Sequence, residues 1–193
     1  MKPSPGMRPI DRAAAEPRRR ALLTLLAPVA MGSILATCVF LSLQLDRHLG
    51  LPRLPGEPLR ILVGIPLVAG GASLAGMSAS RFFRARGTPV PFNPPQDLVV
   101  SGPYRWTRNP MMTGLLTALL GVAFLLRSTA LAVFFLPALA LIMYLVIRFV
   151  EEPELELRFG ESYRRYRTAT PGFVPRLRAS PRRGNYHEGP RPR

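Results

Sequence analysis

Apolar residues along this chain gather into four long runs, separated by segments rich in proline, glycine and charge. The runs cover residues 21–43, 59–80, 111–126 and 129–150. A helix rises about 1.5 Å per residue, so the first, second and fourth runs are long enough to cross the hydrocarbon core of a bilayer. The pattern predicts an all-α, polytopic membrane protein with about four transmembrane helices.

The third and fourth runs are separated by only two residues, Arg127 and Ser128. The third run, 111–126, is short for a full crossing, whereas the fourth, 129–150, reaches across. The short separation predicts a helical hairpin with a very tight turn near one membrane face. The segment that leads into the third run and the segment that leaves the fourth are then expected at the opposite face, close together in space.

Small residues recur every four positions in the second run, at Ala72, Gly76 and Ser80. This spacing places them on one face of a helix, where small side chains let two membrane helices approach closely. We therefore expect this face to be a helix-packing surface.

A second amphipathic pattern follows the fourth run. Leu155, Phe159, Tyr163 and Tyr166 recur on one helical face, which predicts a helix over about residues 153–167 that rests against the membrane domain or the membrane interface. The tails, residues 1–20 and 177–193, are rich in Arg and Pro without apolar periodicity, and we expect them to be disordered. The membrane domain then spans residues 21–176.

The chain is strongly basic, with a formal net charge of +15 from 26 basic and 11 acidic residues. Such charge can indicate nucleic-acid binding. In a chain with transmembrane segments it usually marks the cytoplasmic loops, so no nucleic-acid partner is expected. Arginines concentrate in both tails and in residues 81–110, whereas the hairpin turn holds only Arg127. We therefore expect a multi-pass protein of the inner (cell) membrane, with both termini and residues 81–110 in the cytoplasm.

Several kinds of chemistry find no support in the sequence. Cys38 is the only cysteine, and His48 and His187 are the only histidines, so neither a disulfide nor a metal site is expected. No phosphate-binding or dinucleotide-binding glycine loop follows a predicted strand.

Two polar segments border the open end of the predicted hairpin. Residues 101–110 lead into the third run, and Arg148, Glu151 and Glu152 end the fourth. Adjacent carboxylates repel each other and are costly at a membrane boundary, so they need cations nearby. Arg148 lies one helical turn away, and Arg105 and Arg108 are expected to reach from the other segment. The alternative is a solvated helix end with Arg148 extended toward water.

From about residue 87 to residue 176, the chain resembles the superfamily of isoprenylcysteine carboxyl methyltransferases and phospholipid methyltransferases. The resemblance rests on an ordered set of short motifs: Gly102-Pro103-Tyr104-Arg105, Arg108-Asn109-Pro110, Gly114, Gly121, Glu151-Glu152-Pro153, Leu155, Phe159-Gly160, Tyr163, Tyr166 and Pro175-Arg176. The resemblance implies a membrane enzyme that uses S-adenosylmethionine, bound at a cytosolic site formed by the arginine segment, the two glutamates and the C-terminal helix.

Carried over to this chain, the resemblance implies a set of site residues. The cofactor-binding candidates are Tyr104, Arg105, Arg108, Asn109, Glu151, Glu152, Tyr163 and Tyr166, and the catalytic candidates are Arg108, Asn109 and Glu152. The superfamily commonly has Arg-His-Pro-x-Tyr where this chain has Arg108-Asn109-Pro110-Met111-Met112. Asn109 offers hydrogen bonds but does not titrate, and Met112 lacks the aromatic hydroxyl, which weakens the transfer of the prenylcysteine substrate more than that of the cofactor.

The expected function is transfer of a methyl group from S-adenosylmethionine to a lipid-like or small hydrophobic acceptor, either a carboxylate or an amine. Carboxylates and aromatic faces suit the cationic groups of this cofactor, and Arg105 or Arg108 suits its carboxylate. Two alternatives stay open. One is an NADPH-dependent membrane reductase of the sterol or enone type, whose 2′-phosphate would use Arg105, Arg108 and Arg148. The other is a non-enzymatic membrane scaffold. The oligomeric state is left open.

Overall fold

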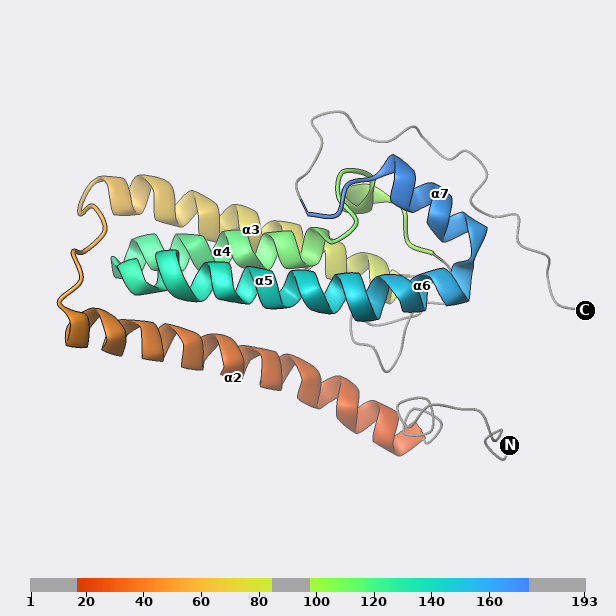
Figure 1. Cartoon of the computed structure of the whole chain (residues 1–193), viewed down its shortest axis with the longest axis horizontal. Helices are drawn as coiled ribbons and strands as arrows, with labels where there is room; N and C mark the ends of the chain where they lie inside the picture. The colour runs from red at the N-terminus through yellow and green to blue at the C-terminus, as the bar shows by residue number, and fades with distance from the viewer. Residues whose placement is uncertain (1–16, 85–97, 174–193) are drawn as a thin grey trace, which may run out of the picture.

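The computed structural model describes residues 17–84 and 98–173, and within these ranges all regular structure is helical. Figure 1 shows α3, α4 and α5 running alongside one another, with α2 below them. The elements, in chain order, are α2 (Pro17–Leu49), α3 (Leu59–Arg84), the 3₁₀ turn η1 (Gly102–Arg105), α4 (Pro110–Leu126), the π-helical turn η2 (Leu131–Phe135), α5 (Leu136–Val146), the π-helical turn η3 (Ile147–Glu151), α6 (Glu152–Phe159) and α7 (Glu161–Ala169).

Three stretches are long and apolar enough to cross a membrane: Pro28–Leu49, Leu59–Arg81 and Leu131–Phe159. The third predicted run, 111–126, corresponds to α4, which is apolar but has only 17 residues. Many large apolar side chains on the long helices point outward, among them Leu62 at 67% and Phe149 at 69% exposure. Exposed apolar surface of this extent suits contact with lipid, and the prediction of an all-α membrane protein is confirmed.

The first helix is longer than predicted at both ends. It begins at Pro17, inside the segment 1–20 predicted to be disordered, because proline is well tolerated in the first turn of a helix. It continues to Leu49 and stops before Gly50, which has a positive φ of 58°. The remainder of the predicted disordered tails, 1–16 and 177–193, lies outside the described residues.

Helices α3 and α4 pack along two pairs of glycines. A Cβ on Gly71 would lie 2.4 Å from the Gly114 carbonyl oxygen, and a Cβ on Gly121 would lie 2.7 Å from the Gly64 carbonyl oxygen. Glycines seven residues apart on each helix therefore let the two antiparallel backbones touch. This contact places the short helix α4 directly against α3 along most of its length.

The small-residue face predicted for α3 is not the face that packs. Ala72, Gly76 and Ser80 are exposed, and a Cβ on Gly76 would meet nothing within 4 Å. The prediction was wrong because α4 also carries glycines seven residues apart. The matching pairs bring the face with Gly64 and Gly71 into contact instead.

The predicted tight turn between α4 and η2 is present, and we call this end of the hairpin the turn end. Arg127 adopts a left-handed backbone conformation with φ 56°, and the Ser128 hydroxyl accepts a hydrogen bond from the Leu131 N–H at 3.1 Å. Asp46 of α2 supplements this cap. Its carboxylate accepts hydrogen bonds from the Ala130 N–H at 2.8 Å and from the Ser128 hydroxyl at 2.5 Å.

The predicted amphipathic helix over residues 153–167 is divided into two helices. Gly160 adopts φ 53° and ψ −127°, a conformation open mainly to glycine, and it separates α6 from α7. Tyr163 and Tyr166 nevertheless pack with Leu155 and Phe159. The four apolar side chains therefore gather around the bend, although they do not share one face of a single helix.

Candidate functional site

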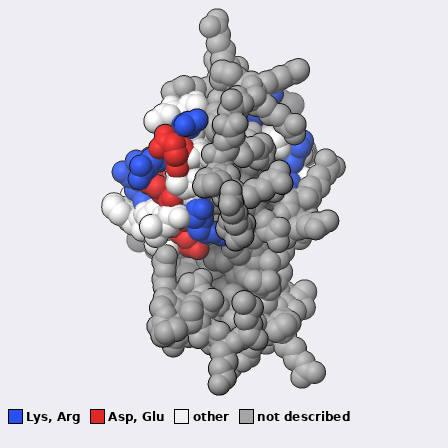
Figure 2. Space-filling model, turned by 90° about the vertical axis from the view of Figure 1, so that its right-hand side faces the viewer, with Lys and Arg blue, Asp and Glu red and all other residues white. Residues whose placement is uncertain are grey.

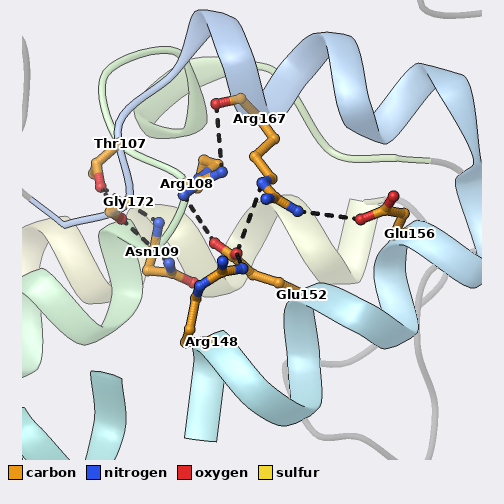
Figure 3. Close-up of polar contacts among 8 residues, drawn as sticks. All are labelled: Thr107, Arg108, Asn109, Arg148, Glu152, Glu156, Arg167 and Gly172. Carbon is orange, nitrogen blue, oxygen red and sulfur yellow. Dashed lines mark hydrogen bonds and ion pairs between the residues drawn. The ribbon is translucent and has the colours of Figure 1, made fainter. Parts of the chain in front are cut away.

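The open end of the hairpin, which we call the site end, contains a buried glutamate held by arginines from two segments (Figure 3). Glu152, at the start of α6, is 5% exposed. Its Oε1 lies 2.8 Å from Nη2 of Arg108, which precedes α4, and its Oε2 lies 3.2 Å from Nη1 of Arg148, one turn earlier in the chain. The prediction that these two segments meet at one end of the hairpin is confirmed.

A further arginine of this cluster was missed by the sequence analysis. Arg167 of α7 lies 4.0 Å from the Glu152 carboxylate and 3.1 Å from the carboxylate of Glu156. Glu156 also pairs with Arg164 at 2.7 Å. No periodic pattern pointed to these contacts, because the bend at Gly160 changes which residues of α6 and α7 face each other.

Four arginines pair with two glutamates in this cluster, so positive charge exceeds negative charge within it. Figure 2 shows red acidic and blue basic groups gathered together on the site end of the molecule. The paired residues are Arg108, Arg148, Arg164, Arg167, Glu152 and Glu156. Such a cluster favours binding of a ligand that carries an anionic group.

The segment after α7 holds Arg108 and its neighbours in place. The Arg108 N–H donates to the Pro171 carbonyl at 2.8 Å. The Gly172 carbonyl accepts from the Thr107 hydroxyl at 2.7 Å and from both the backbone N–H and the side-chain amide of Asn109 at 3.2 Å. The Asn109 amide therefore supports the fold of the site, and its predicted catalytic and cofactor-binding role stays a prediction.

Three tyrosines form a buried cluster beside the ion pairs. The Tyr166 hydroxyl donates to the Tyr104 carbonyl at 2.7 Å, and the rings of Tyr163 and Tyr166 meet edge to face with centroids 6.4 Å apart. Burial, and secondarily the charge of Glu151, raises the pKa of the Tyr104 hydroxyl. Burial raises the pKa of Tyr163 to about 12, with the charge of Glu152 adding to the effect. Both phenols therefore stay protonated at neutral pH.

Glu151 differs from Glu152 in its surroundings. It is half-buried, and within the described part of the chain it makes no ion pair. Its negative charge adds to the raised pKa of Tyr104 and of Tyr163. Arg105, the remaining candidate, is half-buried in η1.

Residues that ligate metals do not gather anywhere in residues 17–84 and 98–173, where no group of three His, Cys, Asp or Glu side chains is present. The fold and the site together define an all-α membrane protein with an arginine-rich, tyrosine-lined polar site at one end of its helices.

A family model described as phospholipid methyltransferase matches residues 59–162, more than half of the chain. The chain belongs to this family, as its motifs predicted, and by family it is a membrane methyltransferase. The match covers α3 to α6 and includes Arg108, Arg148 and Glu152, whereas Arg167 lies beyond it. Comparisons with curated proteins and with solved structures found no match.

Proposed function

We propose that this protein transfers a methyl group from S-adenosylmethionine to a lipid-like or small hydrophobic acceptor at the site end. The observation that carries this proposal is the buried Glu152, which joins Arg108 and Arg148 beside a cluster of buried tyrosines. Removing two charged groups from water is costly, so a buried ion pair contributes little net stability, and one that lies in a polar site is a candidate for a functional role.

Several polar groups at the site lack a partner among the described residues, and their chemistry suits S-adenosylmethionine. Arg108 Nε and the Thr170 hydroxyl are buried and have no hydrogen-bond partner among the described residues. The Tyr163 side chain is 2% exposed and belongs to the neighbouring tyrosine cluster. Glu151 remains without an ion pair there. One buried cation, one carboxylate and two hydroxyls together match a ligand with a carboxylate, two cationic centres and several polar groups.

Each candidate then has a role that follows from its surroundings. When bound, S-adenosylmethionine supplies an electrophilic methyl group on a sulfonium sulfur. Arg108, held rigid by Glu152, binds the carboxylate of the cofactor, and Glu151 with the tyrosine rings stabilises its positive charge. Arg105 and Tyr104 line the site from η1, and Tyr166 supports Tyr104 through their hydrogen bond. Methyl transfer depends chiefly on holding the acceptor in line with the methyl group, so a rigid site suits it.

The methyl acceptor is proposed only by its chemical class, a carboxylate or an amine. A carboxylate acceptor is already nucleophilic at neutral pH, whereas an amine acceptor has to lose a proton first. Both oxygens of Glu152 are engaged by arginines, so Glu151 is the carboxylate of this pair available to accept that proton. Incubating labelled S-adenosylmethionine with membranes that contain the protein, and identifying the labelled product, distinguishes an ester from a methylated amine.

We place the site end at the cytoplasmic face of the inner membrane, because the arginines near Arg108 outnumber those at the turn end. Labelling with a membrane-impermeant thiol reagent tests this. In a Cys38→Ser background, Arg165→Cys is expected to react only in inverted vesicles, and Arg53→Cys only in intact cells. The reverse pattern would put the site on the other face.

Binding is the first test of the proposed function. Calorimetry on detergent-purified protein is expected to show binding of S-adenosylmethionine and loss of that binding in Glu151→Ala and Glu152→Ala. Absence of binding by the wild-type protein would overturn the proposal, and unchanged binding in both variants would remove these glutamates from the site.

The same experiment separates the reductase and scaffold alternatives. A 2′-phosphate would need Arg105, Arg108 and Arg148 together, and two of these already share the Glu152 carboxylate, whereas the single carboxylate of S-adenosylmethionine needs only Arg108. NADPH is therefore expected to bind at least tenfold more weakly than S-adenosylmethionine, a difference of about 1.4 kcal/mol or more. A scaffold would bind neither cofactor.

A further inference from the structure

One acidic side chain spans the bend at Gly160 that separates α6 from α7. Glu156 of α6 accepts hydrogen bonds from Arg164 Nε at 2.7 Å and from Arg167 Nη1 at 3.1 Å. Both arginines belong to α7, and they lie almost one helical turn apart. Glu156 therefore ties α7 to α6 at two points.

Arg167 is the residue through which this tie reaches the site (Figure 3). Its backbone carbonyl accepts a hydrogen bond from Arg108 Nη1 at 3.4 Å. Its guanidinium lies between two carboxylates, 3.1 Å from Glu156 and 4.0 Å from Glu152. The shorter contact is the one to Glu156, so Glu156 determines where the Arg167 side chain rests.

We infer that Glu156 is a positioning residue: by holding Arg167, it keeps the Arg167 carbonyl against Arg108 and the Arg167 guanidinium away from Glu152. The inference rests on the proposed function, in which Arg108 binds the cofactor. Without the charge of Glu156, the carboxylate nearest to Arg167 among the described residues is that of Glu152. A third close arginine there competes with Arg108 and Arg148 for the same two oxygens.

A matched pair of substitutions tests this role. Glu161, on the far side of the bend, also pairs with two arginines, Arg165 at 3.5 Å and Arg164 at 4.0 Å, but not with Arg167. Glu156→Gln is expected to raise the Kd for S-adenosylmethionine about fivefold to tenfold, as coupled neighbours do, whereas Glu161→Gln changes it less than about twofold. Equal effects of the two substitutions would overturn the inference.

A double substitution shows whether Glu156 acts through Arg167. If it does, Glu156→Gln has little further effect on the Kd once Arg167→Gln is present, because no guanidinium remains to move toward Glu152. If Glu156 only braces the bend through Arg164, its effect persists in full in the Arg167→Gln background, and the inference is wrong.

Trp106 provides a readout that needs no cofactor. It is the only tryptophan of the chain, it is 55% exposed, and it lies two residues before Arg108. Glu156→Gln is expected to change the quenching of Trp106 fluorescence by iodide, and Glu161→Gln is not. Wild-type protein that fails to bind S-adenosylmethionine overturns the proposed function and this role with it. If the wild type binds normally, and Glu156→Gln changes neither the iodide quenching of Trp106 nor the Kd, this role alone is overturned.

Discussion

The two ends of the α4–α5 hairpin each hold a carboxylate that joins distant parts of the chain, but their partners differ. At the turn end, Asp46 accepts hydrogen bonds from a backbone N–H and a hydroxyl, both neutral donors. At the site end, Glu152 is paired with Arg108 and Arg148, and Arg167 lies nearby. The charge of Asp46 lies at the N-terminus of a helix, where a negative charge is stabilising, whereas the paired residues of the arginine cluster hold more positive than negative charge. We therefore assign a structural role to the turn end, and the proposed function uses the site end.

The largest effect is expected at the site end, from Glu152→Gln. Arg108 then keeps a buried charge without its anionic partner, which costs about 3 kcal/mol in stability. Binding of S-adenosylmethionine is expected to fall by more than a hundredfold, because Arg108 loses its fixed position. Thermal unfolding in detergent and calorimetry measure the two effects. A stable variant with normal binding would show that the ion pairs of Glu152 matter no more for cofactor binding than the helix cap at the turn end.

The two glycine pairs between α3 and α4 lie at different distances from the two ends of the hairpin. The expected effect of a substitution therefore depends on which pair it changes. Gly71→Ala drives a Cβ into the backbone of Ala118 and Gly114 and is expected to destabilise the protein by about 3 kcal/mol and to weaken cofactor binding. Gly64→Ala meets the Leu125 side chain at 2.8 Å and the Gly121 carbonyl oxygen at 3.1 Å near the turn end, so about 2 kcal/mol is expected, with normal binding. Thermal unfolding compares them. Exposed Gly76→Ala serves as the control and is expected to leave stability unchanged or slightly raised.

At the turn end, Asp46→Ala removes an acceptor from the N-terminus of the helix that follows Ser128. A lost cap costs about 1 kcal/mol, which is expected to lower the unfolding temperature by a few degrees. The Kd for S-adenosylmethionine per folded molecule is expected to match that of the wild type. Loss of binding without loss of stability would show that the turn end acts on the site directly.

Two tyrosines sharpen the comparison within the site end itself. Tyr166→Phe removes the buried hydrogen bond to the Tyr104 carbonyl and is expected to cost about 1 kcal/mol in stability. Tyr163→Phe removes a hydroxyl that the proposed function assigns to ligand binding, so stability is expected to stay nearly the same while the Kd rises a fewfold. Unfolding curves and calorimetry on both variants separate a supporting tyrosine from a binding one. Equal stability losses would assign both to support.

Local pattern was enough to predict the main features of the fold. Runs of apolar residues predicted helices of the observed type, because a backbone in lipid has to satisfy its own hydrogen bonds. The two-residue turn at Arg127-Ser128 predicted the hairpin, and the hairpin predicted that Arg108 and Glu152 would meet at one end. Helix ends were less predictable, as the extension of α2 to Pro17 and Leu49 shows.

The features that pattern alone did not predict depend on contacts between elements. The glycines of α4 determine which face of α3 packs against it. The sequence of one helix alone does not show the surface of the helix it contacts. The roles of Arg167 and Glu156 depend on the bend at Gly160, which turns α7 back toward Arg108.

The sequence by itself therefore determined the helices, their hairpin and the family, since these follow from periodicity, length and short ordered motifs. Only the tertiary structure decided which charges pair, because an ion pair depends on distances of a few ångströms between side chains that are far apart in the chain.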